Sequence, residues 1–113
     1  MQKNNKLNQL KEMRSQLFSE ILQLSKLLHG SWLERYSTCT RPECKCHQGQ
    51  RHGPHYCLVV NENGKQRQKY IPQNKIDEAK IGLSQYKRLQ EIVNQITLLN
   101  LEILKEEAKH ESH

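Results

Sequence analysis

The first segment of the chain carries a narrow apolar stripe. Its positions recur at alternating spacings of three and four residues, and the stripe consists of Leu7, Leu10, Arg14, Leu17, Ile21, Leu24 and Leu28. This spacing is typical of the contact face of a coiled-coil helix, interrupted here by one arginine. We therefore predict an N-terminal helix within residues 1–30. It should end near Leu28–Gly30, where Gly30 supplies a left-handed cap.

The last third of the chain has a broader apolar face. Asn74 is a plausible N-cap, and Asp77 and Glu78 follow where a helix dipole favours acidic side chains. The apolar positions of this segment are Ala79, Leu83, Tyr86, Leu89, Ile92, Val93, Ile96, Leu99, Ile103 and Leu104. We predict a long helix over residues 74–109 that packs antiparallel to the first. Because one partner cannot cover so wide a face, a homo-oligomer is expected, with Asn100 as a candidate for setting the register.

Between the helices, residues 56–73 alternate apolar and polar positions on either side of an Asn-Gly pair. Asn63-Gly64 is a strong signal for a two-residue β-hairpin turn. The expected cross-strand pairs are Val60 with Arg67, Leu58 with Lys69 and Tyr56 with Ile71. The chain is thus predicted to be a single α+β domain, residues 1–113, mainly helical, whose long C-terminal helix packs as a coiled coil or bundle.

All four cysteines fall within residues 39–57. Cys39, Cys44 and Cys46 form a C-x4-C-x-C pattern, which supplies three thiolates to a tetrahedral Zn²⁺ site. His52 is our first choice for the fourth ligand, because the Gly-Pro pair after it can turn the chain back. Cys57 is the second choice, since alternation places it within a strand. Residues 31–55 are therefore predicted to be a zinc-stapled loop.

Two other interpretations of the cysteine cluster stay open. The thiols could simply be exposed at the surface among solvated histidines. They could also form a redox site, although no C-x-x-C pattern occurs in the chain. His47 directly follows Cys46, which makes it geometrically awkward as a ligand of the same metal, and His55 is a further candidate.

Composition favours the structural zinc. Only 35% of the 113 residues are hydrophobic and 5% are aromatic, so the chain has little material for a wide core and needs a staple or an oligomer. No run approaches the roughly 20 apolar residues of a membrane span, and the N-terminus lacks the apolar segment of a signal peptide. We therefore expect a cytoplasmic protein, in which clustered cysteines bind metal more often than they form disulfides.

The net charge of +6 is concentrated in the middle of the chain, where residues 31–75 hold eight Lys/Arg against three Glu. Such a basic region favours polyanions. The candidate phosphate contacts are Arg41, Lys45, Arg51, Lys65, Arg67 and Lys69. Tyr56 and Tyr70 are assigned to the core rather than to base stacking, and Trp32 is expected to cover the junction of helix and hairpin.

No catalytic constellation can be assembled. The chain has no Gly-rich phosphate loop, no G-x-S-x-G, and no H-x-E with P-C-x-x-C of the zinc deaminases. We predict a non-enzymatic protein with no small-molecule substrate. Its expected function is nucleic-acid binding, with DNA as a more favoured partner than RNA. The alternative is a helix-mediated protein-interaction or oligomerisation module.

The run CTRPECKCHQGQRHGPHYC, followed by Gly64-Lys65 and by Tyr70-Ile71-Pro72, resembles an uncharacterised prokaryotic domain family. Its pattern is close to C-G-x-x-x-C-x-C, H-G-P-Y-Y, a strand, G-K and Y-[VI]-P before a long helix, and it extends over about residues 30–105. Thr40 stands where that family usually has glycine, and His55 and Cys57 stand where it has aromatic residues. The resemblance implies a metal site with Cys57 in a packing role, and the link of such proteins to mobile elements implies DNA.

Overall fold

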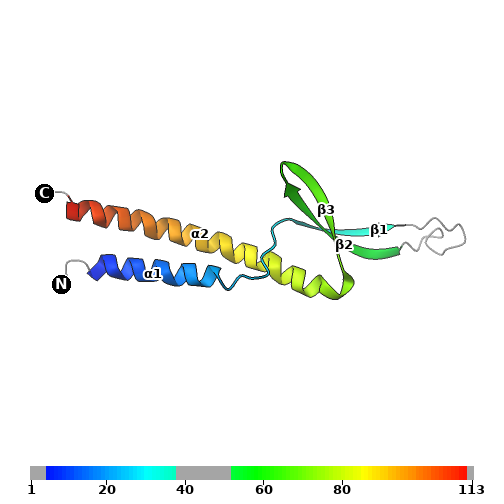
Figure 1. The fold of residues 1–113 in the computed structure, drawn as a ribbon, viewed down its shortest axis with the longest axis horizontal. Helices are drawn as coiled ribbons and strands as arrows, with labels where there is room; N and C mark the ends of the chain where they lie inside the picture. The colour runs from blue at the N-terminus through cyan, green and yellow to red at the C-terminus, as the bar shows by residue number, and fades with distance from the viewer. Residues whose placement is uncertain (1–4, 38–51, 112–113) are drawn as a thin grey trace, which may run out of the picture. The chain divides into compact units, whose positions relative to one another are not determined.

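The structure, a computed structural model, describes residues 5–37 and 52–111 (Figure 1). Its elements are α1 (Asn5–Ile21), β1 (Ser31–Ser37), β2 (His52–Glu62), β3 (Lys65–Ile71), the short 3-10 helix η3 (Gln73–Lys75) and α2 (Ile76–Glu111). They form two compact units. The described residues of Met1–Leu27 and Ser84–His113 make up the helical unit, and those of Leu28–Leu83 make up the sheet unit. The α+β class and the long C-terminal helix are confirmed.

In the helical unit, α1 and α2 run antiparallel. Lys6 near the start of α1 has its Nζ 3.3 Å from a carboxylate oxygen of Glu106 near the end of α2. In the middle of α1, Arg14 Nη1 donates a hydrogen bond of 2.8 Å to Asn100 Oδ1. The arginine that interrupts the apolar stripe is thus paired with the asparagine on the facing helix, and the predicted antiparallel packing is confirmed.

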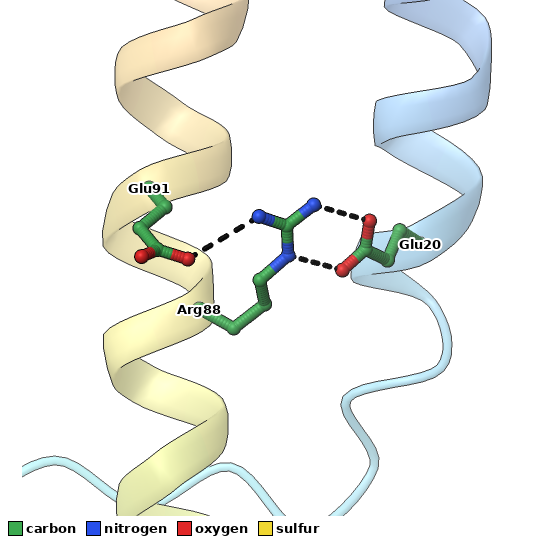
Figure 2. Close-up of polar contacts among 3 residues, drawn as sticks. All are labelled: Glu20, Arg88 and Glu91. Atoms are coloured by element: carbon green, nitrogen blue, oxygen red, sulfur yellow. Dashed lines mark hydrogen bonds and ion pairs between the residues drawn. The ribbon is translucent and has the colours of Figure 1, made fainter.

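A second polar bridge joins the helices at the other end of α1 (Figure 2). Arg88 on α2 donates from both Nε and Nη2 to the carboxylate of Glu20 on α1, the second contact measuring 2.7 Å. Its Nη1 lies 3.2 Å from Glu91 Oε1, one turn further along α2. The guanidinium holds the pKa of Glu20 below its usual value, mainly through these hydrogen bonds.

The apolar contact between the helices is narrow. Ile92, Ile96 and Ile103 are 0%, 8% and 4% exposed, respectively. Val93 and Leu104, which the broad predicted face includes, are instead 52% and 62% exposed. This agrees with the prediction that one partner cannot cover so wide a face, because a single neighbouring helix covers only one strip of a helix surface.

The N-terminal helix ends at Ile21, so the prediction that it continues to Leu28–Gly30 was wrong. The N–H of Leu24 donates to the carbonyl of Ile21, three residues back, at 3.0 Å, which closes the last turn. The N–H of Leu28 donates to the carbonyl of Gly82 at 3.1 Å instead of to a helical partner. The leucine spacing continues past the end of the helix, but the backbone groups there bond elsewhere.

In the sheet unit, the three strands form an antiparallel sheet in the order β1-β2-β3. Asn63 and Gly64 occupy the turn between β2 and β3 with φ of 54° and 84°. These positive angles are those of the predicted type of hairpin turn. The register confirms each expected pair: Val60 with Arg67, Leu58 with Lys69 and Tyr56 with Ile71.

The sheet has one strand more than the sequence predicts. Residues of Ser31–Ser37, assigned above to the loop 31–55, form β1, and β2 begins at His52 rather than at Tyr56. β1 pairs with β2 along most of its length. This assignment was wrong because the loop interpretation had no partner for the segment, and a strand becomes stable only once its backbone groups are paired across a sheet.

Gly30 permits a close approach of the backbone to β2. A Cβ at this position would lie 2.6 Å from the carbonyl oxygen of Val59 and 2.9 Å from Cγ of Leu58. Among the described glycines, Gly64 has a positive φ and Gly30 does not. The prediction that Gly30 is a left-handed helix cap was therefore wrong. The glycine is required for space.

Among the described residues of the sheet unit, the buried apolar side chains are Leu58, Cys57 and Ala79, at 3%, 9% and 6% exposure. The ring of Trp32 lies 5.4 Å from that of Tyr56, measured between centroids, at an interplanar angle of 32°. Within the described ranges, neither helix is long and apolar enough to cross a membrane.

Candidate metal loop and nucleic-acid interface

The cysteine-rich segment connects two residues that are paired in the sheet. Ser37, at the end of β1, pairs with His52, at the start of β2, after a register irregularity between Arg35 and Ser37. The predicted ligands Cys39, Cys44 and Cys46 lie outside the described residues, as do Arg41, Lys45 and Arg51. The pairing brings the two ends of this segment side by side.

The predicted fourth ligand and its alternative occupy different places on β2. The backbone of His52 lies at the first position of the strand, beside the end of β1. Cys57 lies five residues further along, buried between Leu33 on β1 and Tyr70 on β3. At about 3.3 Å per residue, these two positions are roughly 17 Å apart.

Cys57 has the surroundings of a packing residue. It is a free thiol and is 9% exposed. Within residues 5–37 and 52–111, no three His, Cys, Asp or Glu side chains come together as a metal site would require. A small, buried, free cysteine in a strand commonly packs as an ordinary apolar side chain does.

The three predicted basic residues that are described all lie on β3. Lys65, Arg67 and Lys69 are exposed and project from one face of the strand, because residues two apart in a strand point to the same side. Lys69 Nζ lies 2.9 Å from Glu62 Oε2. Among the described residues, neither Lys65 nor Arg67 forms an ion pair. The structure thus brings together half of the predicted set, and one of these cations is already paired.

The strand order exposes the whole of β3. As an outer strand of the sheet it is bonded only to β2, and every residue of it except Ile71 is exposed. Tyr70 is 58% exposed, so its assignment to the core was wrong. The hairpin pattern alone could not reveal this, because a third strand on the other side of β3 would have covered it.

Sequence reasoning also missed a polar contact on the opposite face from Lys65, Arg67 and Lys69. Arg35 Nη1 on β1 donates a hydrogen bond of 2.7 Å to Gln68 Oε1 on β3, bridging across β2. Both side chains are exposed. Arg35 was not among the candidate contacts because the segment containing it was assigned to a loop. The alternation of a strand was the signal that could have found it.

Trp32 and its neighbours form a partly buried aromatic group. Lys80 on α2 has its Nζ 5.9 Å from the centre of the Trp32 ring, a cation–π distance. Trp32 is half-buried, in line with its predicted covering role. Loss of solvent contact, followed by the nearby carboxylate of Glu34, raises the pKa of Tyr56, so this phenol stays neutral well above physiological pH.

No curated protein and no solved structure matches the chain. One family model, described as a domain of unknown function (DUF6788), matches residues 7–80. The match begins within α1 and ends in the first turns of α2, so it includes the N-terminal helix that the resemblance seen in the sequence, over about residues 30–105, left out. A match of this length, over most of the chain, shows that the protein belongs to the DUF6788 family.

Proposed function

We propose that this protein is a small zinc-binding, nucleic-acid-binding protein that acts by binding and not by catalysis, in the cytoplasm, with DNA preferred to RNA. The observation that carries the proposal is the exposed outer strand β3, which presents Lys65, Arg67 and Lys69 from one face. Regularly spaced cations on a rigid strand can contact successive phosphates. A link with mobile elements is part of this proposal.

The proposed Zn²⁺ ligands are Cys39, Cys44, Cys46 and His52. The pairing of Ser37 with His52 supports this set, because it places the start of the cysteine segment beside the histidine. Three thiolates and an imidazole are a donor set that suits a closed, structural zinc. Binding of the ion would contribute folding free energy to the segment that carries these ligands.

Elemental analysis tests the zinc proposal on protein purified without added metal. We expect one zinc per chain, and its loss or marked weakening in His52→Ala. Cys57→Ser is the matched control, since Cys57 lies roughly 17 Å along the strand from His52, and this variant should keep its zinc. Less than half an equivalent of zinc in the wild type, with no increase after refolding with zinc, would contradict the proposal.

A salt series of electrophoretic mobility shifts tests nucleic-acid binding, using duplex DNA, single-stranded DNA and RNA with zinc-loaded protein. Each phosphate contact contributes about 0.9 to the slope of log affinity against log salt for duplex DNA. Lys65→Gln with Arg67→Gln should therefore weaken binding and lower the slope by roughly 2. We choose this pair because Lys69 already contacts Glu62.

The matched control is Lys11→Gln with Lys87→Gln, which removes the same charge from the helical unit. This variant should keep the wild-type slope if β3 carries the contacts. An unchanged slope for the β3 variant would instead place the contacts elsewhere, for example at Arg41, Lys45 and Arg51. Binding that does not respond to salt would overturn the nucleic-acid function altogether.

A second candidate function is helix-mediated protein interaction or oligomerisation, with the zinc loop as a structural knuckle. An apolar groove in the helical unit, with a volume of about 510 Å³, favours it. Met13 and Leu98 line this groove and are 51% and 57% exposed. Apolar side chains gathered at one exposed place are a common feature of protein-binding surfaces. Association through such a groove should depend little on salt, in contrast to phosphate binding.

A further inference from the structure

The groove between α1 and α2 is lined by apolar and polar side chains. Its apolar lining consists of Met13 and Leu17 of α1 and Leu98 and Leu99 of α2, and the polar lining consists of Gln16, Glu20, Gln95 and Glu102. Met13 and Leu98 expose about half of their surface, although each has apolar neighbours within the same groove. A second apolar surface laid over it would remove these side chains from water.

Charges on α2 continue on the same side of the helix as the groove. Glu91, Leu98 and Lys105 are spaced by seven residues. Seven residues are nearly two full turns and drift by only about 20°, so the three side chains share one side of α2. That side therefore presents an acidic, an apolar and a basic position in sequence, centred on Leu98.

This order is self-complementary in one orientation only. If two α2 helices cross antiparallel about a two-fold axis at Leu98, Lys105 of each chain faces Glu91 of the other, which gives two ion pairs. In a parallel arrangement, Lys105 would face Lys105 and Glu91 would face Glu91, and like charges would repel. The charges thus select the antiparallel arrangement.

Both charged groups are available for such a contact. Lys105 is exposed and forms no ion pair among the described residues. Glu91 is exposed and touches Arg88 through one oxygen, at 3.2 Å, while both Nε and Nη2 of that arginine are engaged by Glu20 (Figure 2). A carboxylate has capacity for further donors.

We propose that a second copy of this chain covers the groove, with the two α2 helices antiparallel about Leu98 and Lys105 of each copy paired with Glu91 of the other. Two helical hairpins then form a four-helix bundle. The inference identifies the partner in the interaction role proposed above, and it does not depend on zinc or nucleic acid.

The same geometry supplies a matched control. Lys87 and Lys109 each lie eleven residues from Leu98, in opposite directions, so Lys87 of one copy would face Lys109 of the other. The Nζ of Lys109 lies 3.3 Å from Glu106 Oε1 of its own chain. Lys105→Glu would bring two acidic groups together at each symmetric contact, whereas Lys87→Glu would place opposite charges together. The two variants change the net charge equally, so only the proposed geometry distinguishes them.

Sedimentation equilibrium without nucleic acid, at tens of micromolar protein, tests the proposal. The wild type should have twice the mass of one chain. Lys105→Glu should raise the dimer dissociation constant by about tenfold or more, because both ion pairs are lost and replaced by repulsion. Glu91→Lys combined with Lys105→Glu should restore dimerisation, and Lys87→Glu should leave it unchanged or strengthen it.

Circular dichroism on each variant verifies that the helices form, and Leu98→Gln, a change at an exposed position, should also favour the monomer. A monomeric wild type overturns the proposal, as does equal weakening by Lys105→Glu and Lys87→Glu. A trimer or larger assembly overturns it as well. None of these outcomes bears on phosphate binding by β3, because the assay contains no nucleic acid.

Discussion

Among the described residues, the helical unit and the sheet unit each have three well-buried apolar side chains, but the remaining contacts differ in kind. In the helical unit, side-chain bridges such as Arg88 with Glu20 and Arg14 with Asn100 join elements that are distant in sequence. In the sheet unit, backbone pairing along β1, β2 and β3 joins the strands. The contact of Arg88 with Glu20 depends on the charge of a carboxylate and hence on pH, whereas the backbone contacts depend on how closely the chain can approach itself.

The difference also separates the two proposed roles. Backbone pairing of β1 with β2 holds Ser37 beside His52, and the outer strand β3 presents Lys65 and Arg67. The helices instead use most of their inward-facing side chains for each other and leave Leu98 exposed. The sheet unit therefore exposes basic side chains, and the helical unit exposes apolar side chains that its small core does not bury.

Removal of a core side chain should produce the largest effect, and it should remain within one unit. Ile92→Ala in the helical unit and Leu58→Ala in the sheet unit should each cost about 2–5 kcal/mol of unfolding free energy, since both side chains are almost completely buried. Chemical denaturation measures the loss. Amide hydrogen exchange should rise mainly in the unit that carries the substitution.

Leu104→Ala is the control for the helical unit, because Leu104 is 62% exposed. It should change stability by less than about 0.5 kcal/mol. The only tryptophan, Trp32, lies in the sheet unit, so its fluorescence reports on that unit separately from the helical circular dichroism signal. If Ile92→Ala and Leu104→Ala had equal costs, the description of the narrow helical core would be incorrect.

A smaller effect is expected from Gly30→Ala, which tests the dependence of the sheet unit on close backbone approach. The new Cβ would lie 2.6 Å from the carbonyl oxygen of Val59, and the backbone there must shift. Overpacking of this kind costs about 1–3 kcal/mol. The loss should appear in the thermal transition followed by Trp32 fluorescence.

Gly64 distinguishes steric crowding from backbone conformation. It has φ of +84°, and no atom lies within 4 Å of the place that a Cβ would take, so Gly64→Ala should be costly only through its left-handed backbone. Asn tolerates that conformation, and Gly64→Asn should recover much of the loss. Gly30→Asn should recover nothing, and recovery there would show that space is not the reason for Gly30.

Local signals in the sequence were sufficient for most of the fold. The three-and-four spacing predicted both helices and their antiparallel packing, and the Asn63-Gly64 pair predicted the hairpin register residue by residue. Each of these signals acts within a few residues or within one helix face. They could be interpreted without any knowledge of the rest of the chain.

What could not be predicted depends on contacts between distant segments. The leucine spacing continues to Leu28, but that residue bonds to Gly82, far along the chain, and the helix has already ended. β1 exists because β2 pairs with it, and Tyr70 is exposed because β3 is the outer strand. For the candidate site, strand alternation predicted that Arg67 and Lys69 share one face, whereas the position of Lys65 on that face and the pairing of Lys69 with Glu62 required the structure.

Acid should weaken the helical unit by an amount smaller than either core truncation or crowding at Gly30. The pKa of Glu20 is lowered in the folded protein by hydrogen bonds from Arg88, and that of Glu106 is lowered by Lys109 and Lys6. A carboxyl group with a lowered folded pKa stabilises the protein fully above its unfolded pKa. This contribution is lost as the pH falls below the unfolded value and through the folded one. The helical signal should thus become less stable from about pH 5 downward.

Arg88→Gln tests the cause of this acid response, because it removes the guanidinium that lowers the pKa of Glu20. At pH 7 the variant should be less stable than the wild type, and its stability should fall less between pH 7 and pH 3, since Glu20 then gains little from being charged. Lys87→Gln, at the adjacent residue, removes the same charge without touching that bridge. It should therefore keep the wild-type acid response in urea denaturation followed by circular dichroism. If Arg88→Gln and Lys87→Gln have the same acid response, Glu20 does not contribute to it, and the contrast between a pH-dependent helical unit and a backbone-paired sheet unit would have to rest on Glu106 alone.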